Sequence, residues 1–124
     1  MLFTADQFVA HAIGDYILQS HAMATNKTKS SLWAAIHAVT YTLPFLLITQ
    51  APAAIAVICG THFLIDRFRL ARFVVWLKNG PWHPLTATGY QDGVPPWLAV
   101  WLLIAADNII HVCVNGAAIW YWGA

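Results

Sequence analysis

Long apolar segments with very few charges constrain this chain more strongly than any other feature. Hydrophobic residues make up 60% of the sequence and charged residues only 9%, and Glu does not occur at all. A soluble domain usually has about 25% charged residues, so this chain lacks the charge that a water-facing surface needs. The sequence therefore predicts a membrane protein, and its 124 residues suffice for a single domain.

Four of the apolar segments approach the length of about 20 residues that a membrane-spanning helix needs. We expect an all-α, polytopic membrane protein with four transmembrane helices, the third continued by an extension at the membrane interface. The Pro- and Gly-rich residues 79–95 are expected to form a cytoplasmic loop. The predicted helices cover residues 3–24, 31–50, 52–78 and 96–121 of one domain, 1–124.

The basic residues predict how these helices are oriented. They are Lys27, Lys29, Arg67, Arg69, Arg72 and Lys78. They lie either between the first two segments or after the apolar part of the third. Because cytoplasmic loops carry an excess of Lys and Arg, we expect both regions in the cytoplasm and both termini in the periplasm of a bacterial inner membrane. The net charge of +1 argues against nucleic acid as a partner.

Three predicted helices each contain a His and an Asp four residues apart, which places the two side chains on one helix face. Lipid cannot satisfy polar groups, so such faces are expected to point into the helix bundle. A charged Asp at depth costs at least about 2.5–3.5 kcal/mol, and a divalent cation offsets that charge. The candidate metal ligands are His11, Asp15, His62, Asp66, Asp107 and His111.

Zinc and manganese are the expected ions, because imidazole and carboxylate groups are suitable ligands for both. Since the chain has no Glu, either an Asp or hydroxide on the metal has to act as the base. The substrate-binding candidates include a lysine that would meet a phosphate. The candidate catalytic residues are Asp15, Asp66 and Asp107, and the candidate substrate-binding residues are Gln19, Lys27 and His37.

The order of these residues resembles a family of small bacterial and phage integral-membrane proteins of unknown function. The resemblance rests on HAIGDYILQSHAMATNK (11–27), a His early in the second segment, HFLID (62–66) and DNIIH (107–111). At a greater distance the pattern is similar to the LexA-regulated, membrane-bound metal-dependent hydrolases, which also set His and Asp on several short transmembrane helices. The first resemblance implies no activity, and the second implies metal-dependent hydrolysis.

We therefore expect an integral membrane metalloprotein that hydrolyses a phosphoester of a lipid or lipid-linked substrate. Two alternatives stay open. The same residues suit a protein that handles protons or ions, and the polar faces also suit a non-catalytic accessory or phage-exclusion subunit. Membrane lipids are the expected partners, and both a homo-oligomer and a larger membrane complex are compatible with the sequence.

Overall fold

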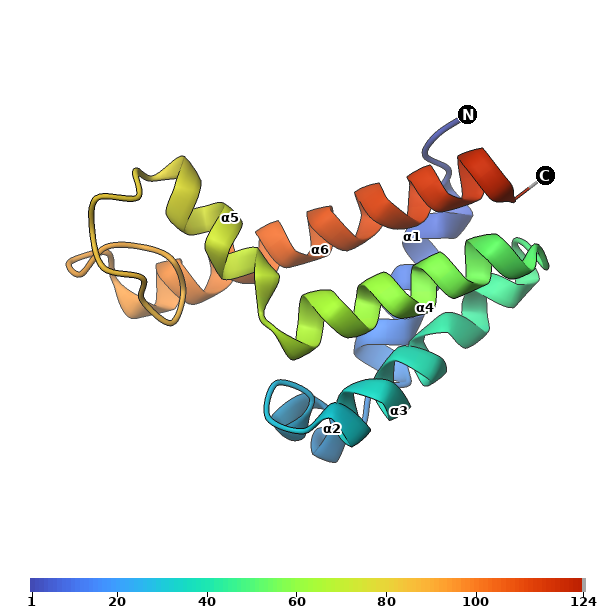
Figure 1. The fold of residues 1–124 in the computed structure, drawn as a ribbon, viewed down its shortest axis with the longest axis horizontal. Coiled ribbons are helices and arrows are strands. Elements are labelled where there is room, and N and C mark those ends of the chain that lie inside the picture. The colour runs from blue at the N-terminus through green and yellow to red at the C-terminus, as the bar shows by residue number, and fades with distance from the viewer. Residues whose placement is uncertain (124) are drawn as a thin grey trace. The chain divides into compact units, whose positions relative to one another are not determined.

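The computed structural model describes residues 1–123, and every regular element in that range is a helix (Figure 1). The all-α part of the prediction is therefore confirmed. The chain divides into two compact units. The first contains Met1–Phe68 together with the residues from His111 onward, and the second contains Arg69–Ile110.

Short helices with defined ends build the first unit. Ser20 accepts a hydrogen bond from the backbone N–H of Met23, and Ser30 accepts one from that of Trp33, so each serine caps the helix that follows it. The elements are α1 (Ala5–Ala12), the π-helix η1 (Ile13–Ile17), α2 (His21–Asn26), α3 (Ser31–Thr42), the 3₁₀ helix η2 (Leu43–Leu47), α4 (Pro52–Arg67) and the C-terminal part of α6 (Pro96–Trp122).

The core of the first unit lies between these helices. Tyr41, Phe45 and Ile58 are fully buried and pack together with two small residues, Ala10 and Ala118. α3 lies alongside α4 (Figure 1), and most of the core side chains come from this pair and from η2. The core therefore holds α1, α3, α4 and the end of α6 in one packed group.

A glycine lets η1 approach α3 closely. A Cβ atom at Gly14 would lie 2.6 Å from Cδ2 of Tyr41 and 2.9 Å from the Tyr41 backbone oxygen. Both distances are shorter than side-chain carbons tolerate, so only glycine fits here. The contact brings the next residue, Asp15, against α3.

The prediction of four transmembrane helices is wrong. Within residues 1–123 only α6, with 27 residues and a mean hydropathy of 1.9 in its most apolar window, is long and apolar enough to cross a membrane. α1 has 8 residues, α3 has 12 and α4 has 16, against the 20 or so that a span needs. Apolar sequence continues past the ends of these helices, but the serine caps and the change to 3₁₀ geometry at Leu43 interrupt them.

Two helices replace the single one expected over residues 52–78. α4 ends at Arg67, and α5 (Leu70–Lys78) begins after Arg69, whose φ of 52° is left-handed. In the second unit residues 79–95 form no regular element. Side chains of the α5 region fasten this loop: the Trp76 indole donates to the His83 backbone oxygen at 2.8 Å, and Arg69 donates to the Ala87 backbone oxygen at 2.7 Å.

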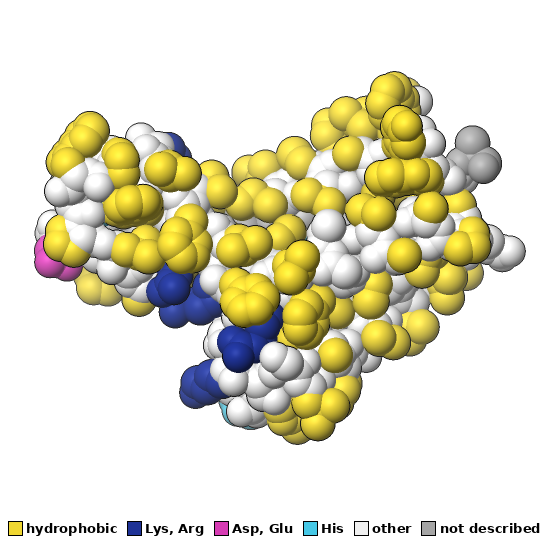
Figure 2. All heavy atoms as spheres, viewed as in Figure 1, with side chains coloured by type: hydrophobic (Ala, Val, Ile, Leu, Met, Phe, Trp, Pro, Cys, Tyr) yellow, Lys and Arg dark blue, Asp and Glu magenta, His cyan; other side chains and the backbone are white. Residues whose placement is uncertain are grey.

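The surface of the protein is unusually apolar. Figure 2 shows hydrophobic side chains over most of the visible face. On α3 and η2, Leu32 is 68% exposed, Val39 58% and Leu47 93%. Only 17% of the most apolar window of α6 is buried. Contiguous apolar surface of this kind marks a site of contact with protein or membrane.

Candidate metal centre

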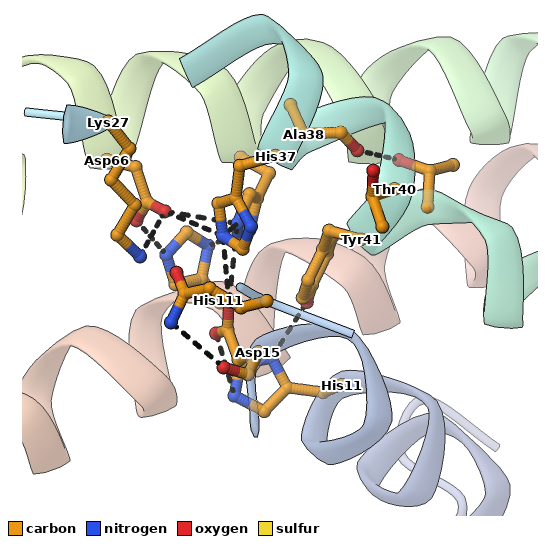
Figure 3. Close-up of polar contacts among 12 residues, drawn as sticks. His11, Asp15, Lys27, His37, Ala38, Thr40, Tyr41, Asp66 and His111 are labelled. Carbon is orange, nitrogen blue, oxygen red and sulfur yellow. Dashed lines mark hydrogen bonds and ion pairs between the residues drawn. The ribbon is translucent and has the colours of Figure 1, made fainter. Parts of the chain in front are cut away.

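Four side chains from three elements of the first unit converge on one buried point (Figure 3). They are Asp15 from η1, His37 from α3, and His62 and Asp66 from α4. One ligand atom from each lies within 4.8 Å of all the others. The two imidazoles are at most 1% exposed and the two carboxylate side chains 9% and 4%. We call these four residues the His–Asp cluster.

The donor atoms of the His–Asp cluster lie close to one another. The Nε2 atoms of His37 and His62 are 2.8 Å apart, and each lies 3.2 Å from Oδ2 of Asp66. From Oδ1 of Asp15 they lie 3.2 Å and 3.5 Å away. A tetrahedral zinc ion with bonds of about 2.0–2.1 Å holds its ligand atoms about 3.3–3.4 Å apart. The four atoms therefore lie close enough together to bind one ion.

Local helix geometry places each ligand. His62 and Asp66 are one turn apart on α4, so they share a face. Asp15 lies in the π-helix η1, whose wider turn departs from the 3.6-residue period, and π-helical turns are frequent at functional sites. His37 is fully buried on the face of α3 that meets α4.

His111 lies behind the cluster and orients two of its members. Its Nε2 is 3.1 Å from Oδ1 of Asp66, and its Nδ1 is 3.2 Å from Nδ1 of His62. An ionised carboxylate only accepts, so Nε2 of His111 donates to Asp66. His111 therefore contacts both members of the His62–Asp66 pair from behind, the position of the groups that orient metal-bound histidines.

A second polar chain reaches the cluster through Tyr41. Asn115 Nδ2 donates to the Tyr41 hydroxyl at 2.6 Å, and that oxygen is 2.7 Å from Nδ1 of His11. Nε2 of His11 lies 3.7 Å from Oδ2 of Asp15. The Tyr41 ring also stacks on His62, with centroids 3.6 Å apart. Tyr41 thus supports one carboxylate and one imidazole of the cluster.

Burial and neighbouring groups shift the pKa values of Asp15 and Asp66 in opposite directions. Burial alone would raise the pKa of Asp66, but its contacts with His111, His37 and His62 hold that pKa well below its usual range. Burial also acts to raise the pKa of Asp15, but the hydrogen bond with His37 and the positive charge of the nearby Lys27 outweigh it, so the pKa is lowered. Both carboxylates are therefore ionised at neutral pH.

The pKa values of the two imidazoles of the cluster, His37 and His62, are shifted in opposite directions. Burial lowers the pKa of His62 to about 4, so its ring is neutral at pH 7, the form that binds metal. Burial also acts to lower the pKa of His37, but the contacts with Asp15 and Asp66 outweigh it and raise that pKa. Nδ1 of His37 is buried without a hydrogen-bond partner among residues 1–123, so only its Nε2 interacts with the other members of the cluster.

The residues predicted to bind substrate lie at the edge of the cluster or within it. Lys27, just after α2, places Nζ 2.7 Å from Oδ2 of Asp66 (Figure 3). Gln19 donates from Nε2 to the backbone oxygen of Asp15 at 3.1 Å, and its Oε1 is buried without a hydrogen bond in the described chain. His37 is itself one of the four converging residues.

The six predicted metal ligands fall into three groups. Asp15, His62 and Asp66 belong to the His–Asp cluster. His11 and His111 contact it from behind. Asp107, one helical turn before His111 on α6, belongs to the second unit.

The sequence alone did not assign Tyr41 and Asn115 to the site. Their signal was spacing, since each lies four residues after a histidine of the site, His37 and His111 respectively. Four-residue spacing along an apolar helix is also typical of ordinary core packing, and hydrogen bonding to the site distinguishes these two residues from the rest of the core.

The chemistry of the cluster suits a metal ion. Two imidazole nitrogens and two carboxylate oxygens are ligands for zinc and for other first-row divalent ions. The two ionised carboxylates carry a charge of about −2, which one divalent ion neutralises. A buried cluster that converges on one point and balances the charge of its guest can hold a metal ion.

One protein-family model matches residues 2–84, described as "Protein of unknown function (DUF3307)". The chain belongs to this family. No curated protein and no solved structure matches the chain. The four members of the His–Asp cluster and Lys27 all lie inside the region that matches DUF3307, whereas His111 and Asn115 lie beyond it.

Proposed function

We propose that this protein is a membrane metalloprotein that binds one divalent ion, zinc or manganese, in the His–Asp cluster and uses it to hydrolyse a phosphoester. One observation supports the metal site most strongly. Five separations among the four donor atoms lie between 2.8 Å and 3.5 Å, close to those around a four-coordinate ion.

The ion supplies electrophilic chemistry, because a bound divalent metal polarises a phosphoryl oxygen and lowers the pKa of water. Asp15 is our candidate base. One of its carboxylate oxygens would hold the ion, and the other takes a proton from water while the water oxygen forms the new bond to phosphorus. The bond between phosphorus and the leaving oxygen breaks, and Asp15 returns the proton to that oxygen. Asp66 holds the ion, Gln19 supports the backbone of Asp15, and Lys27 meets the phosphate. A catalytic role for Asp107 stays a prediction.

The substrate we propose is a lipid or a lipid-linked phosphoester at the bacterial inner membrane. α6 supports membrane attachment, because it is 27 residues long and its most apolar window is only 17% buried. Trp101, Ile109 and Trp120 on this helix are each more than 60% exposed. Extraction of membranes with alkaline carbonate tests the attachment: we expect the protein to stay in the membrane pellet, and complete release would contradict it.

Metal content of the purified protein tests the centre. Inductively coupled plasma mass spectrometry should find about one divalent ion per wild-type chain and a large loss in His62→Ala. His21→Ala is the matched control, because His21 is exposed at the start of α2 and lies outside the cluster. A metal-free wild type, or equal metal in the wild type and His62→Ala, would refute the centre.

Hydrolysis is tested separately on the metal-loaded protein in detergent. We expect release of phosphate from phosphatidic acid that stops on chelation and returns on addition of zinc or manganese. Metal-loaded protein with no turnover on phosphomonoester and phosphodiester lipids would leave a metal-binding module without hydrolase activity.

Proton transfer is the second candidate function, favoured by the polar contacts that run from Asn115 through Tyr41 and His11 to Asp15. A relay needs such a chain of exchangeable protons. In liposomes it would produce pH-dependent proton flux that persists after chelation, whereas the hydrolase requires the metal.

A further inference from the structure

We infer that Lys27 is an internal cation at the metal centre, and that entry of a divalent ion releases it to bind a phosphoryl group beside the metal. The inference rests on the proposed metal centre and adds how that centre acquires an anionic ligand. It makes phosphate binding conditional on metal.

Lys27 and a bound metal ion would compete for the same atom, Oδ2 of Asp66. Nζ of Lys27 lies 2.7 Å from Oδ2 of Asp66. The same oxygen lies 3.2 Å from Nε2 of His37 and 3.2 Å from Nε2 of His62. Oδ2 forms no directed hydrogen bond in the described chain, so these contacts are electrostatic. The ammonium group of Lys27 therefore contacts the same carboxylate oxygen that would bind a metal ion (Figure 3).

Charge makes the two cations compete. The ionised Asp15 and Asp66 side chains are buried, and the ammonium group of Lys27 contacts Asp66 directly. A divalent ion neutralises both carboxylates by itself. The ammonium would then be a surplus positive charge next to the ion in a poorly solvated site, where repulsion is stronger than in water. Release of Lys27 removes that repulsion.

The position of Lys27 permits its release. Its side chain is 18% exposed, against 4% for Asp66 and 0% for His37, so it forms the solvent-facing edge of the cluster. It stands at the end of α2, where the chain leaves the helix. Lys27 itself lies outside both α3 and α4.

A released Lys27 would face an anion from the same side as the metal. A second basic residue stands at this edge: Arg67 donates to the backbone oxygen of Thr28 at 3.0 Å and to the Ser31 hydroxyl at 3.2 Å. A phosphoryl group has enough oxygens to contact the ion and the ammonium together, and lysine binds phosphate as a point charge. The ligand class is therefore a phosphoryl anion, either free phosphate or a lipid headgroup.

Calorimetric titration of the metal-stripped full chain in detergent tests the competition. Zinc alone is titrated into the wild type, Lys27→Met and Lys27→Arg. We expect Lys27→Met to bind zinc more tightly than the wild type, by about 5-fold to 150-fold, the usual range for coupled sites. Lys27→Arg, which keeps the charge, should stay close to the wild type. The control is Lys29→Met, an exposed lysine two residues away, and it should not change zinc affinity.

Phosphate binding by the wild type is the second test of the inference, and it needs no variant. Inorganic phosphate should bind the zinc-loaded chain and not the metal-stripped chain. Micelles with and without phosphatidic acid distinguish the source: displacement of bound phosphate by phosphatidic acid points to a lipid headgroup, and no displacement points to free phosphate. Either result supports the inference, since both place a phosphoryl anion beside the metal.

Two results would overturn the inference about Lys27. One is a Lys27→Met variant that binds zinc no more tightly than the wild type. The other is phosphate binding that is equal with and without zinc. Failure of the wild type to bind zinc at all would instead reject the metal centre, so the two claims fail in different ways.

Discussion

Removal of a single oxygen atom, in Tyr41→Phe, should destabilise the first unit strongly. The ring is retained, so its stacking on His62 and its place in the core are unchanged. The hydroxyl, however, takes a hydrogen bond from Asn115 at 2.6 Å and contacts Nδ1 of His11 at 2.7 Å. Both partners are buried, with 2% and 5% exposure. A buried polar group that loses its partner costs about 1–3 kcal/mol.

The loss at Asn115 alone lowers the free energy of unfolding by about 1–3 kcal/mol. For a chain of this size that corresponds to a fall in melting temperature of roughly 3–15 °C. Urea or thermal unfolding followed by circular dichroism, on metal-free protein in one detergent, measures the change. Tyr121→Phe is the matched control, because Tyr121 is 70% exposed, and it should stay within about 0.5 kcal/mol of the wild type. Equal stability of the two variants would refute the buried network around Tyr41.

Two further substitutions, with a third as a control, test the geometry of the cluster. Gly14→Ala places a methyl group 2.6 Å from the Tyr41 ring and should cost about 1–3 kcal/mol in unfolding free energy. Gly60→Ala, where a Cβ has open space, should instead stabilise α4 by about 0.5–1 kcal/mol; equal effects in urea titrations would contradict the close contact of η1 with α3. His111→Ala removes the group that orients His62 and Asp66, so zinc affinity measured by chelator competition should fall about 10–100-fold. An unchanged affinity would mean that His111 does not position the ligands.

The sequence was informative about the site because short-range spacing carries over into the helix. His62 and Asp66 could be assigned to one face from their four-residue separation. The expectation that buried polar faces meet inside a helical bundle also described the first unit, where Asp15 and His37 join them. Spacing within a helix could not say which groups bind directly and which act from behind, because that depends on how the helices pack.

The lengths of the helices were predicted wrongly from the sequence. Hydropathy does not detect a helix end inside an apolar run, and here the ends depend on single residues. Ser30 caps α3, Leu43 begins the tighter 3₁₀ turn, and Arg69 adopts a left-handed conformation between α4 and α5. The π-helical turn at Asp15 was not expected from the sequence, and Gly14 within it packs closely against Tyr41.

X-ray absorption at the zinc edge, on the zinc-loaded full chain, tests the central claim most directly, because it reports the atoms bound to the ion. The account predicts a first shell of nitrogen and oxygen only, at about 2.0–2.1 Å, with the outer-shell scattering of two imidazole rings. One of those rings should be missing from any zinc that His62→Ala retains. A first shell containing sulfur at about 2.3 Å, from Cys59 or Cys113, or a shell without imidazole, would contradict a metal held by Asp15, His37, His62 and Asp66.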